Sequence, residues 1–141
     1  MIKKASAVWR GNFKEGGGTL STETGVLNEA PYGAKARFEN GKGTNPEELI
    51  GAAHAGCFSM ALSLMLEQAG LTAEKIETSA AITLEKLASG YEITSSHLDV
   101  AARIPGADPA AFAEIAEKAK VGCPVSKLLK TKITMDAKLV G

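Results

Sequence analysis

The segment 49–66 contains no Asp, Glu, Lys or Arg, and this uncharged run constrains the fold more than any other feature of the chain. A helix of about 20 such residues can span a lipid bilayer. Here, however, His54, Ser59 and Ser63 interrupt the run, and acidic residues flank it at both ends. We therefore expect a helix that is buried on nearly all sides inside a protein core, and no membrane span.

The ends of this helix carry clear sequence signals. Asn45 can cap the N-terminus, Pro46 suits the first helical position, and Glu48 falls three residues after the cap, as in a capping box. Gly70 is a natural residue to follow the C-terminus. The pattern predicts a helix from Pro46 to about Gln68.

A helix that is apolar on all sides needs protein on every side, which a small domain can rarely provide alone. Two such helices, one from each subunit, would bury each other in a homodimer. Small residues that allow close backbone approach support this hypothesis: Gly51, Ala52, Ala55 and Gly56. The alternative is that the sheet and a later helix cover the segment within one chain.

The remaining segments predict an α+β fold with antiparallel sheets and segregated helices. We expect strands at 4–9, 19–22 and 34–38, the last carrying Arg37, with a turn at 31–33. A hairpin of strands 76–87 and 91–104 should turn at Ser89-Gly90 and bulge near Ser95-Ser96. A helix at 108–120, a short helix from Pro124 and a strand at 133–140 complete the order.

The length and composition bound the class of protein. A chain of 141 residues suits a single domain, residues 1–141. Its 16 basic and 16 acidic residues form no block of like charge, which argues against nucleic acid or a membrane surface as the main partner. Two cysteines are too few for a secreted disulfide scaffold. The N-terminus lacks the apolar stretch of a secretory signal, so we expect the cytoplasm.

The two cysteines are the main candidates for chemistry. Cys57 lies in the middle of the uncharged helix, and Cys123 directly precedes Pro124 at the start of a predicted helix. A buried cysteine is often only a small inert core residue, and this alternative applies to both. A thiolate at Cys57 could instead attack a peroxide O–O bond and become a sulfenic acid. Helix amides would favour a thiolate at Cys123, which could then condense with that sulfenic acid.

Arg37 and Glu47 are candidates to activate such a thiol. A guanidinium at Arg37 could keep the Cys57 thiolate ionised, although a solvent-facing arginine is the simpler interpretation. Glu47 lies in the first helical turn, where a carboxylate suits the helix dipole in any case. Ten helical residues, about 15 Å along the axis, separate it from Cys57, so one straight helix cannot bring the two together. Glu47 would therefore serve a Cys57 site from the other subunit.

His54 lies three residues before Cys57, on the same face of the helix. It could act as a base, or form half of a metal site with Cys57. The chain has only two histidines and two cysteines, so a four-ligand zinc site would also need carboxylates. We expect no metal, and a packed or hydrogen-bonded His54.

The chain closely resembles the OsmC/Ohr family of osmotically inducible and organic-hydroperoxide-resistance proteins. The resemblance rests on the motifs Asn-Pro-Glu-Glu-Leu at 45–49, His-Ala-Gly-Cys at 54–57 and Val-Gly-Cys-Pro-Val-Ser at 121–126. Three further stretches match the OsmC branch, at 18–22, 31–33 and 37–39. The similarity runs essentially end to end.

The resemblance implies a long buried central helix in an intertwined homodimer, with an active site at each side of the interface. It also implies a thiol-dependent hydroperoxide reductase with Cys57 as the peroxidatic cysteine and Cys123 as the resolving cysteine. Glu47 matches the family's glutamate, and Arg37 matches the catalytic arginine of the OsmC branch. Ohr-branch proteins place their arginine near the position of Arg10, which remains an alternative.

The expected reaction is reduction of an organic hydroperoxide to an alcohol, in defence against oxidative and osmotic stress. Apolar walls from Phe38, Phe58 and Met60 would admit an alkyl or lipid-derived hydroperoxide. The family's reductants are small dithiols, notably lipoyl groups on proteins, so no bound cofactor is expected and dithiothreitol should also serve. Two alternatives remain: a non-catalytic redox sensor or stress-induced binding protein, and a small-molecule-binding module with incidental cysteines.

Overall fold

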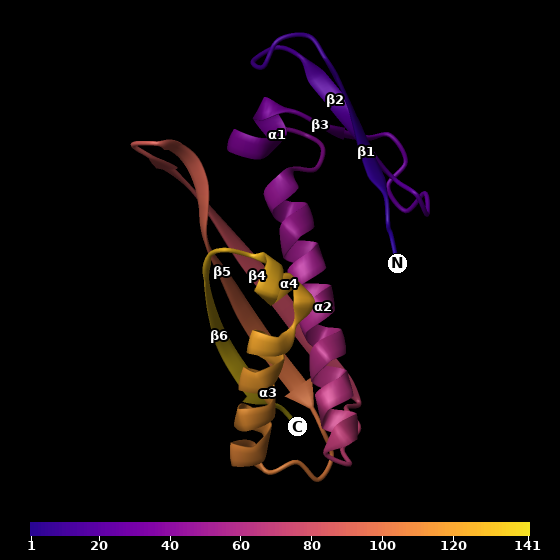
Figure 1. The fold of residues 1–141 in the computed structure, drawn as a ribbon, viewed down its shortest axis with the longest axis vertical. Coiled ribbons are helices and arrows are strands. Elements are labelled where there is room, and N and C mark those ends of the chain that lie inside the picture. The colour runs from indigo at the N-terminus through magenta and orange to yellow at the C-terminus, as the bar shows by residue number, and fades with distance from the viewer. The chain divides into compact units, whose positions relative to one another are not determined.

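The computed structural model describes all residues, 1–141, and divides into two compact units, Met1–Leu49 and Ile50–Gly141. Figure 1 shows the elements in chain order. They are β1 (Ala5–Arg10), β2 (Gly17–Thr22), β3 (Ala30–Tyr32), α1 (Ala34–Phe38), α2 (Pro46–Gln68), β4 (Lys75–Leu87), β5 (Gly90–Arg103), α3 (Pro109–Gly122), α4 (Pro124–Leu128) and β6 (Lys132–Leu139). The predicted α+β class is confirmed.

The first unit contains an antiparallel sheet with the order β1-β2-β3. Gly18 on the central strand is needed for close packing, because a Cβ there would lie 2.2 Å from the Val8 carbonyl oxygen and 2.7 Å from the Tyr32 ring. A larger residue would push the outer strands away. This packing holds the aromatic side chains of β1 and β3 beside each other.

Two predictions for this unit are wrong. Residues 34–38 form the short helix α1, with the Arg37 N–H donating to the Gly33 carbonyl at 3.1 Å. Alanine, lysine and arginine are good helix formers, and five residues are too few for alternation to separate a strand from a helix. Pro31 and Tyr32, expected in a turn at 31–33, instead belong to the edge strand β3, where Pro31 is tolerated.

The predicted ends of α2 are confirmed. The Asn45 side chain accepts from the Glu48 N–H at 2.7 Å, while the Glu48 carboxylate accepts from the Thr44 hydroxyl at 2.7 Å. At the other end, Gly70 has a φ of +76°, and the Leu71 N–H donates to the Leu66 carbonyl at 2.9 Å. The bonds from the Glu48 and Leu71 N–H groups satisfy backbone groups that a helix end leaves without partners.

The second unit contains a three-stranded sheet with the order β4-β5-β6. The β4–β5 hairpin turns at residues 88–89, with Gly90 as the first residue of β5 at a φ of +121°. Its register shifts because Thr83 pairs with Ser95 and Leu84 with Ile93, which leaves Thr94 as the extra residue of the predicted bulge.

The expectation of purely antiparallel sheets is wrong for the last strand. β6 pairs with β5 in parallel, for example Leu98 with Met135. The chain between them passes through α3 and α4, and a crossover of this kind returns the chain in the same direction. The helices α2 and α3 lie side by side in this unit (Figure 1).

The core of the second unit joins one stripe of α2 to α3 and β5. Its fully buried members include Phe58, Leu62, Leu66, Leu98 and Ala116. A Cβ at Gly51 would lie 3.2 Å from the Ala80 carbonyl oxygen, so glycine allows α2 to approach β4 closely.

The opposite face of α2 is exposed within one chain, contrary to the prediction of burial on nearly all sides. Met60 is 76% exposed and Leu64 is 54% exposed. By length and composition alone α2 could cross a membrane, yet its other stripe packs in a protein core as in soluble α+β proteins. An exposed apolar face on a long helix is typical of an interaction surface.

Candidate active site

The two cysteines lie together in the second unit. Cys57 is on α2 and partly buried, while Cys123 is fully buried at the junction of α3 and α4. Both thiols are free, and they share a side-chain hydrogen bond. Residues 66 positions apart in the chain are thus adjacent in the fold, which is the arrangement that the two-cysteine hypothesis requires.

The surroundings of Cys57 raise the pKa of its thiol. Burial is the largest cause, followed by the hydrogen bond with Cys123, whereas the Val125 backbone N–H lowers the pKa. No basic side chain is among the groups that act on this thiol. A reactive thiolate at neutral pH therefore needs a cation in addition to the second unit's own groups.

His54 is fully buried beside the cysteines and is hydrogen-bonded on both ring nitrogens. Its Nδ1 lies 2.6 Å from Ser96 Oγ on β5, and its Nε2 lies 2.8 Å from Ser126 Oγ on α4. A neutral imidazole can donate from one nitrogen and accept at the other, and each hydroxyl can take the complementary role. The prediction of a hydrogen-bonded His54 is confirmed.

Burial lowers the pKa of His54 from its ordinary value near 6.5, so acid should destabilise the fold. Below about pH 6.5 the unfolded chain binds a proton at this residue that the folded chain resists, and stability therefore falls as the pH falls, with a slope of at most about 1.4 kcal/mol per pH unit. Urea unfolding between pH 7.5 and 5.5 measures this slope. The slope should be smaller in His54→Gln than in the parent protein, and equal slopes in the two proteins would contradict its assignment to His54.

Arg37 and Glu47 form an ion pair within the first unit. Nη2 of Arg37 lies 2.7 Å from Oε1 of Glu47, and Nε lies 3.1 and 3.2 Å from the two carboxylate oxygens. Glu47 is nearly buried, with 11% of its side chain exposed, whereas the Arg37 side chain is 34% exposed. A fork of this kind fixes the guanidinium plane and leaves its remaining N–H groups to bind another partner.

A small apolar pocket of about 160 Å³ adjoins Arg37 in the same unit. Its walls include Trp9, Phe13 and Tyr32, and the Trp9 and Tyr32 rings meet edge to face at a centroid distance of 5.5 Å. Motif and residue type did not predict these three aromatics as site residues. The signal available was their concentration in the first 32 residues of a chain with few aromatic residues.

The predicted apolar walls need a correction. Phe58 is fully buried in the core of the second unit and cannot line an open site, because helical spacing puts it on the stripe with Leu62. The Arg37 guanidinium lies over the Phe38 ring, with Cζ of Arg37 5.2 Å from the ring centroid. The Phe13 and Phe38 rings are tilted relative to each other, with their centroids 6.2 Å apart. Met60 is exposed on the uncovered face of α2.

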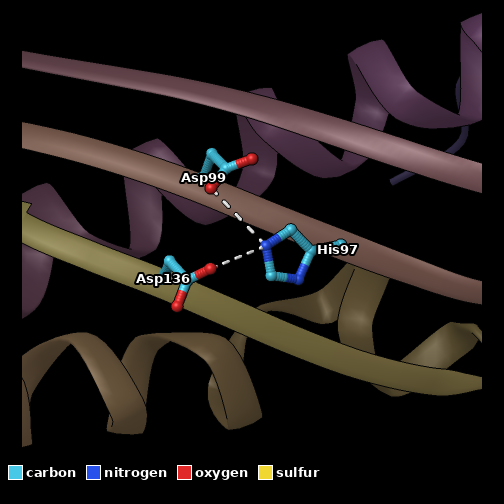
Figure 2. Close-up of side chains that lie close together, drawn as sticks. All are labelled: His97, Asp99 and Asp136. Atoms are coloured by element: carbon cyan, nitrogen blue, oxygen red, sulfur yellow. Dashed lines mark ion pairs between the residues drawn. The ribbon is translucent and has the colours of Figure 1, made fainter.

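A further polar cluster occupies the sheet of the second unit (Figure 2). Nε2 of His97 lies 3.2 Å from Asp136 Oδ2 and 3.5 Å from Asp99 Oδ1, while its Nδ1 is hydrogen-bonded to the Thr134 hydroxyl. By residue type and spacing, the side chains of His97, Asp99 and Asp136 could hold a metal ion. Both carboxylates are largely exposed, and the ion pairs with His97 account for the arrangement without a metal.

This chain is similar to known proteins in both sequence and fold. The family model described as OsmC-like protein matches residues 39–138. The chain belongs to the OsmC-like protein family. It is 56% identical over 137 residues to Peroxiredoxin OsmC of Escherichia coli strain K12, and the aligned residues cover 97% of this chain and 96% of that protein. The match to this relative shows that the chain is an enzyme of the peroxidase class with a peroxiredoxin-type function.

Other proteins of similar sequence or fold support this family assignment. An organic hydroperoxide resistance protein of Xanthomonas axonopodis pv. citri is 27% identical over 100 residues, covering 70% of this chain and 68% of that protein. The crystal structure of the organic hydroperoxide resistance protein OhrB of Bacillus subtilis matches with a TM-score of 0.72 at 26% identity, over 97% of this chain and 98% of that chain. An OsmC-like protein of Mycoplasma pneumoniae shares the fold at 16% identity, with a TM-score of 0.78 and coverage of 100% and 99%.

Proposed function

We propose that this OsmC-like protein, acting as one functional domain of residues 1–141, reduces organic hydroperoxides to alcohols through Cys57 and Cys123. The observation that carries the proposal is that the two free thiols lie close enough for Cys123 to act on the pKa of Cys57. Two thiols this close can form a disulfide without a large rearrangement. An isolated core cysteine would have no such partner.

The proposed cycle has three balanced steps. The Cys57 thiolate attacks the distal oxygen of the hydroperoxide ROOH, the O–O bond breaks, and the leaving alkoxide takes a proton to become ROH. Cys57 is then a sulfenic acid. The Cys123 sulfur attacks the Cys57 sulfur, which forms a disulfide and releases water. An external dithiol reduces the disulfide to two thiols and becomes a disulfide itself.

Arg37 is the proposed cation that lowers the Cys57 pKa and binds the peroxide oxygens, with Glu47 holding its guanidinium plane. The raised pKa of Cys57 within its own unit supports the need for such a group. We propose that Arg37 and Glu47 reach Cys57 from the partner subunit of a homodimer. The exposed apolar face of α2 supports a homodimer because a second copy would cover it.

The apolar pocket beside Arg37 supports an organic substrate. Its walls of Trp9, Phe13 and Tyr32 would favour the alkyl group of an organic or lipid-derived hydroperoxide over hydrogen peroxide, which has none. The Xanthomonas relative and the Bacillus neighbour are both named for resistance to organic hydroperoxides. The natural reductant would be a dithiol such as a protein-bound lipoyl group, in the cytoplasm, with dithiothreitol as its laboratory substitute.

One experiment tests the proposal. The reduced protein is treated with one equivalent of cumene hydroperoxide, alkylated and analysed by peptide mass spectrometry. We expect a Cys57–Cys123 crosslink and one equivalent of cumyl alcohol. Repeated turnover with dihydrolipoamide, followed as steady peroxide loss, separates an enzyme from a sensor that is oxidised only once. Overoxidised Cys57 beside a free Cys123 would remove Cys123 from its assigned role.

A further inference from the structure

A buried histidine joins the segment that carries Cys123 to the helix that carries Cys57. His54 precedes Cys57 by three residues on α2, and Ser126 follows Cys123 by three residues on α4. The cysteines form one link between these segments, and the 2.8 Å bond from His54 Nε2 to Ser126 Oγ forms a second. The two links are thus spaced by nearly one helical turn, about 4.5 Å, along α2.

Two contacts with α2 fix the position of α4 more completely than one contact does. A single contact between the thiols would let α4 rotate about that contact, whereas a second contact one turn away fixes its orientation as well. α4 needs such support because it has only five residues and a helix this short is not stable alone. We propose that His54 is a positioning residue that, through Ser126, holds Cys123 in line with Cys57 for disulfide formation. This inference rests on the proposed function of the two cysteines.

The ring of His54 is itself held in place. Its Nδ1 bonds Ser96 Oγ on β5 at 2.6 Å, so rotation of the ring would break bonds on both sides. Neither nitrogen has access to water, because His54 and Ser96 have no exposed surface. Losing a bond would leave a buried polar atom without a partner, which is costly in a core. The imidazole is therefore a fixed spacer between the sheet, α2 and α4.

The step that depends on this alignment is resolution. Cys57 sulfenic acid and the Cys123 thiol become a disulfide and water, and this reaction competes with a second hydroperoxide that would oxidise Cys57 to the sulfinic acid. Anything that reduces the time Cys123 spends in line with Cys57 favours overoxidation. The first oxidation of Cys57 does not use Cys123 and should not depend on the His54 bridge.

The chain offers a matched pair of variants. Ser126→Ala and Ser96→Ala each remove one hydroxyl from the same imidazole, but only Ser126→Ala releases α4. We expect Ser126→Ala to slow disulfide formation and raise the ratio of sulfinic acid to disulfide by roughly five- to tenfold, as for loss of one hydrogen bond. Ser96→Ala leaves the bond between His54 and Ser126 in place and should therefore have a smaller effect than Ser126→Ala. Ser126→Thr, which keeps a hydroxyl, should restore the parent ratio.

A second readout needs no peroxide. The equilibrium between the dithiol and the Cys57–Cys123 disulfide in glutathione buffers measures how closely the thiols are held. Ser126→Ala should shift this equilibrium toward the dithiol by a similar factor, and Ser96→Ala should shift it less. Equal effects of the two variants in folded protein, checked by thermal unfolding, would overturn the inference. Because this measurement is independent of peroxide, it distinguishes failure of the His54 bridge from failure of the proposed peroxidase function.

Discussion

Replacement of Cys57 by serine is expected to reduce peroxide consumption to the uncatalysed rate, a loss on the order of 10³-fold or more, because the attacking atom is removed. The side chain is partly buried and serine is nearly the same size, so the fold should persist. Consumption of cumene hydroperoxide with dihydrolipoamide as reductant measures the loss. Unchanged consumption would indicate a binding module in which the cysteines are incidental.

Cys123→Ser is the matched control for this prediction. It makes the same chemical change in the other thiol, and the first equivalent of peroxide should still be consumed at the parent rate. The oxidised Cys57 should then persist as sulfenic acid, which a dimedone adduct reports, and proceed to sulfinic acid with excess peroxide. A first turnover lost in Cys123→Ser but kept in Cys57→Ser would reverse the two assigned roles.

Arg37→Lys is expected to lower kcat/KM for organic hydroperoxides by about 10²-fold, as for loss of one oriented donor group at an active site. Lysine keeps the charge but cannot reproduce the fork in which Nε and Nη2 both bind the Glu47 carboxylate. The Cys57 pKa, followed by thiolate absorbance, should also rise in the variant. This spectroscopic shift would separate an effect on the thiol from a general loss of structure.

Arg10→Lys is the control for the arginine assignment. Arg10 lies exposed at the end of β1 and is the alternative arginine that the resemblance to the Ohr branch left open. If Arg37 is the activating group, Arg10→Lys should leave kcat/KM within about twofold. A large loss in Arg10→Lys together with a normal Arg37→Lys would move the role to Arg10.

Local patterns were enough to predict most elements of this chain. The cap at Asn45 and the glycine at position 70 each depend on neighbours within a turn or two of helix. The predicted helices and the β4–β5 hairpin with its bulge are confirmed for the same reason. The short segment 34–38 failed because five residues carry too little periodicity.

The candidate site residues were predicted from residue type and motif, whereas their contacts in the fold were not predictable. Nothing near His54 in the chain indicates Ser96 and Ser126, which lie 42 and 72 positions away. The same holds for the aromatic pocket beside Arg37, whose walls come from two strands and the loop that follows β1.

The sequence by itself determined the order of the elements, the ends of the long helix and the two thiols available for redox chemistry, because each depends on local propensity or residue type. Only the tertiary structure decided that β6 runs parallel to β5, that Phe58 faces the core, and that Cys57 lies against Cys123. These features depend on how α3 and α4 return the chain across the sheet, and contacts between distant segments leave no periodic signal in either segment.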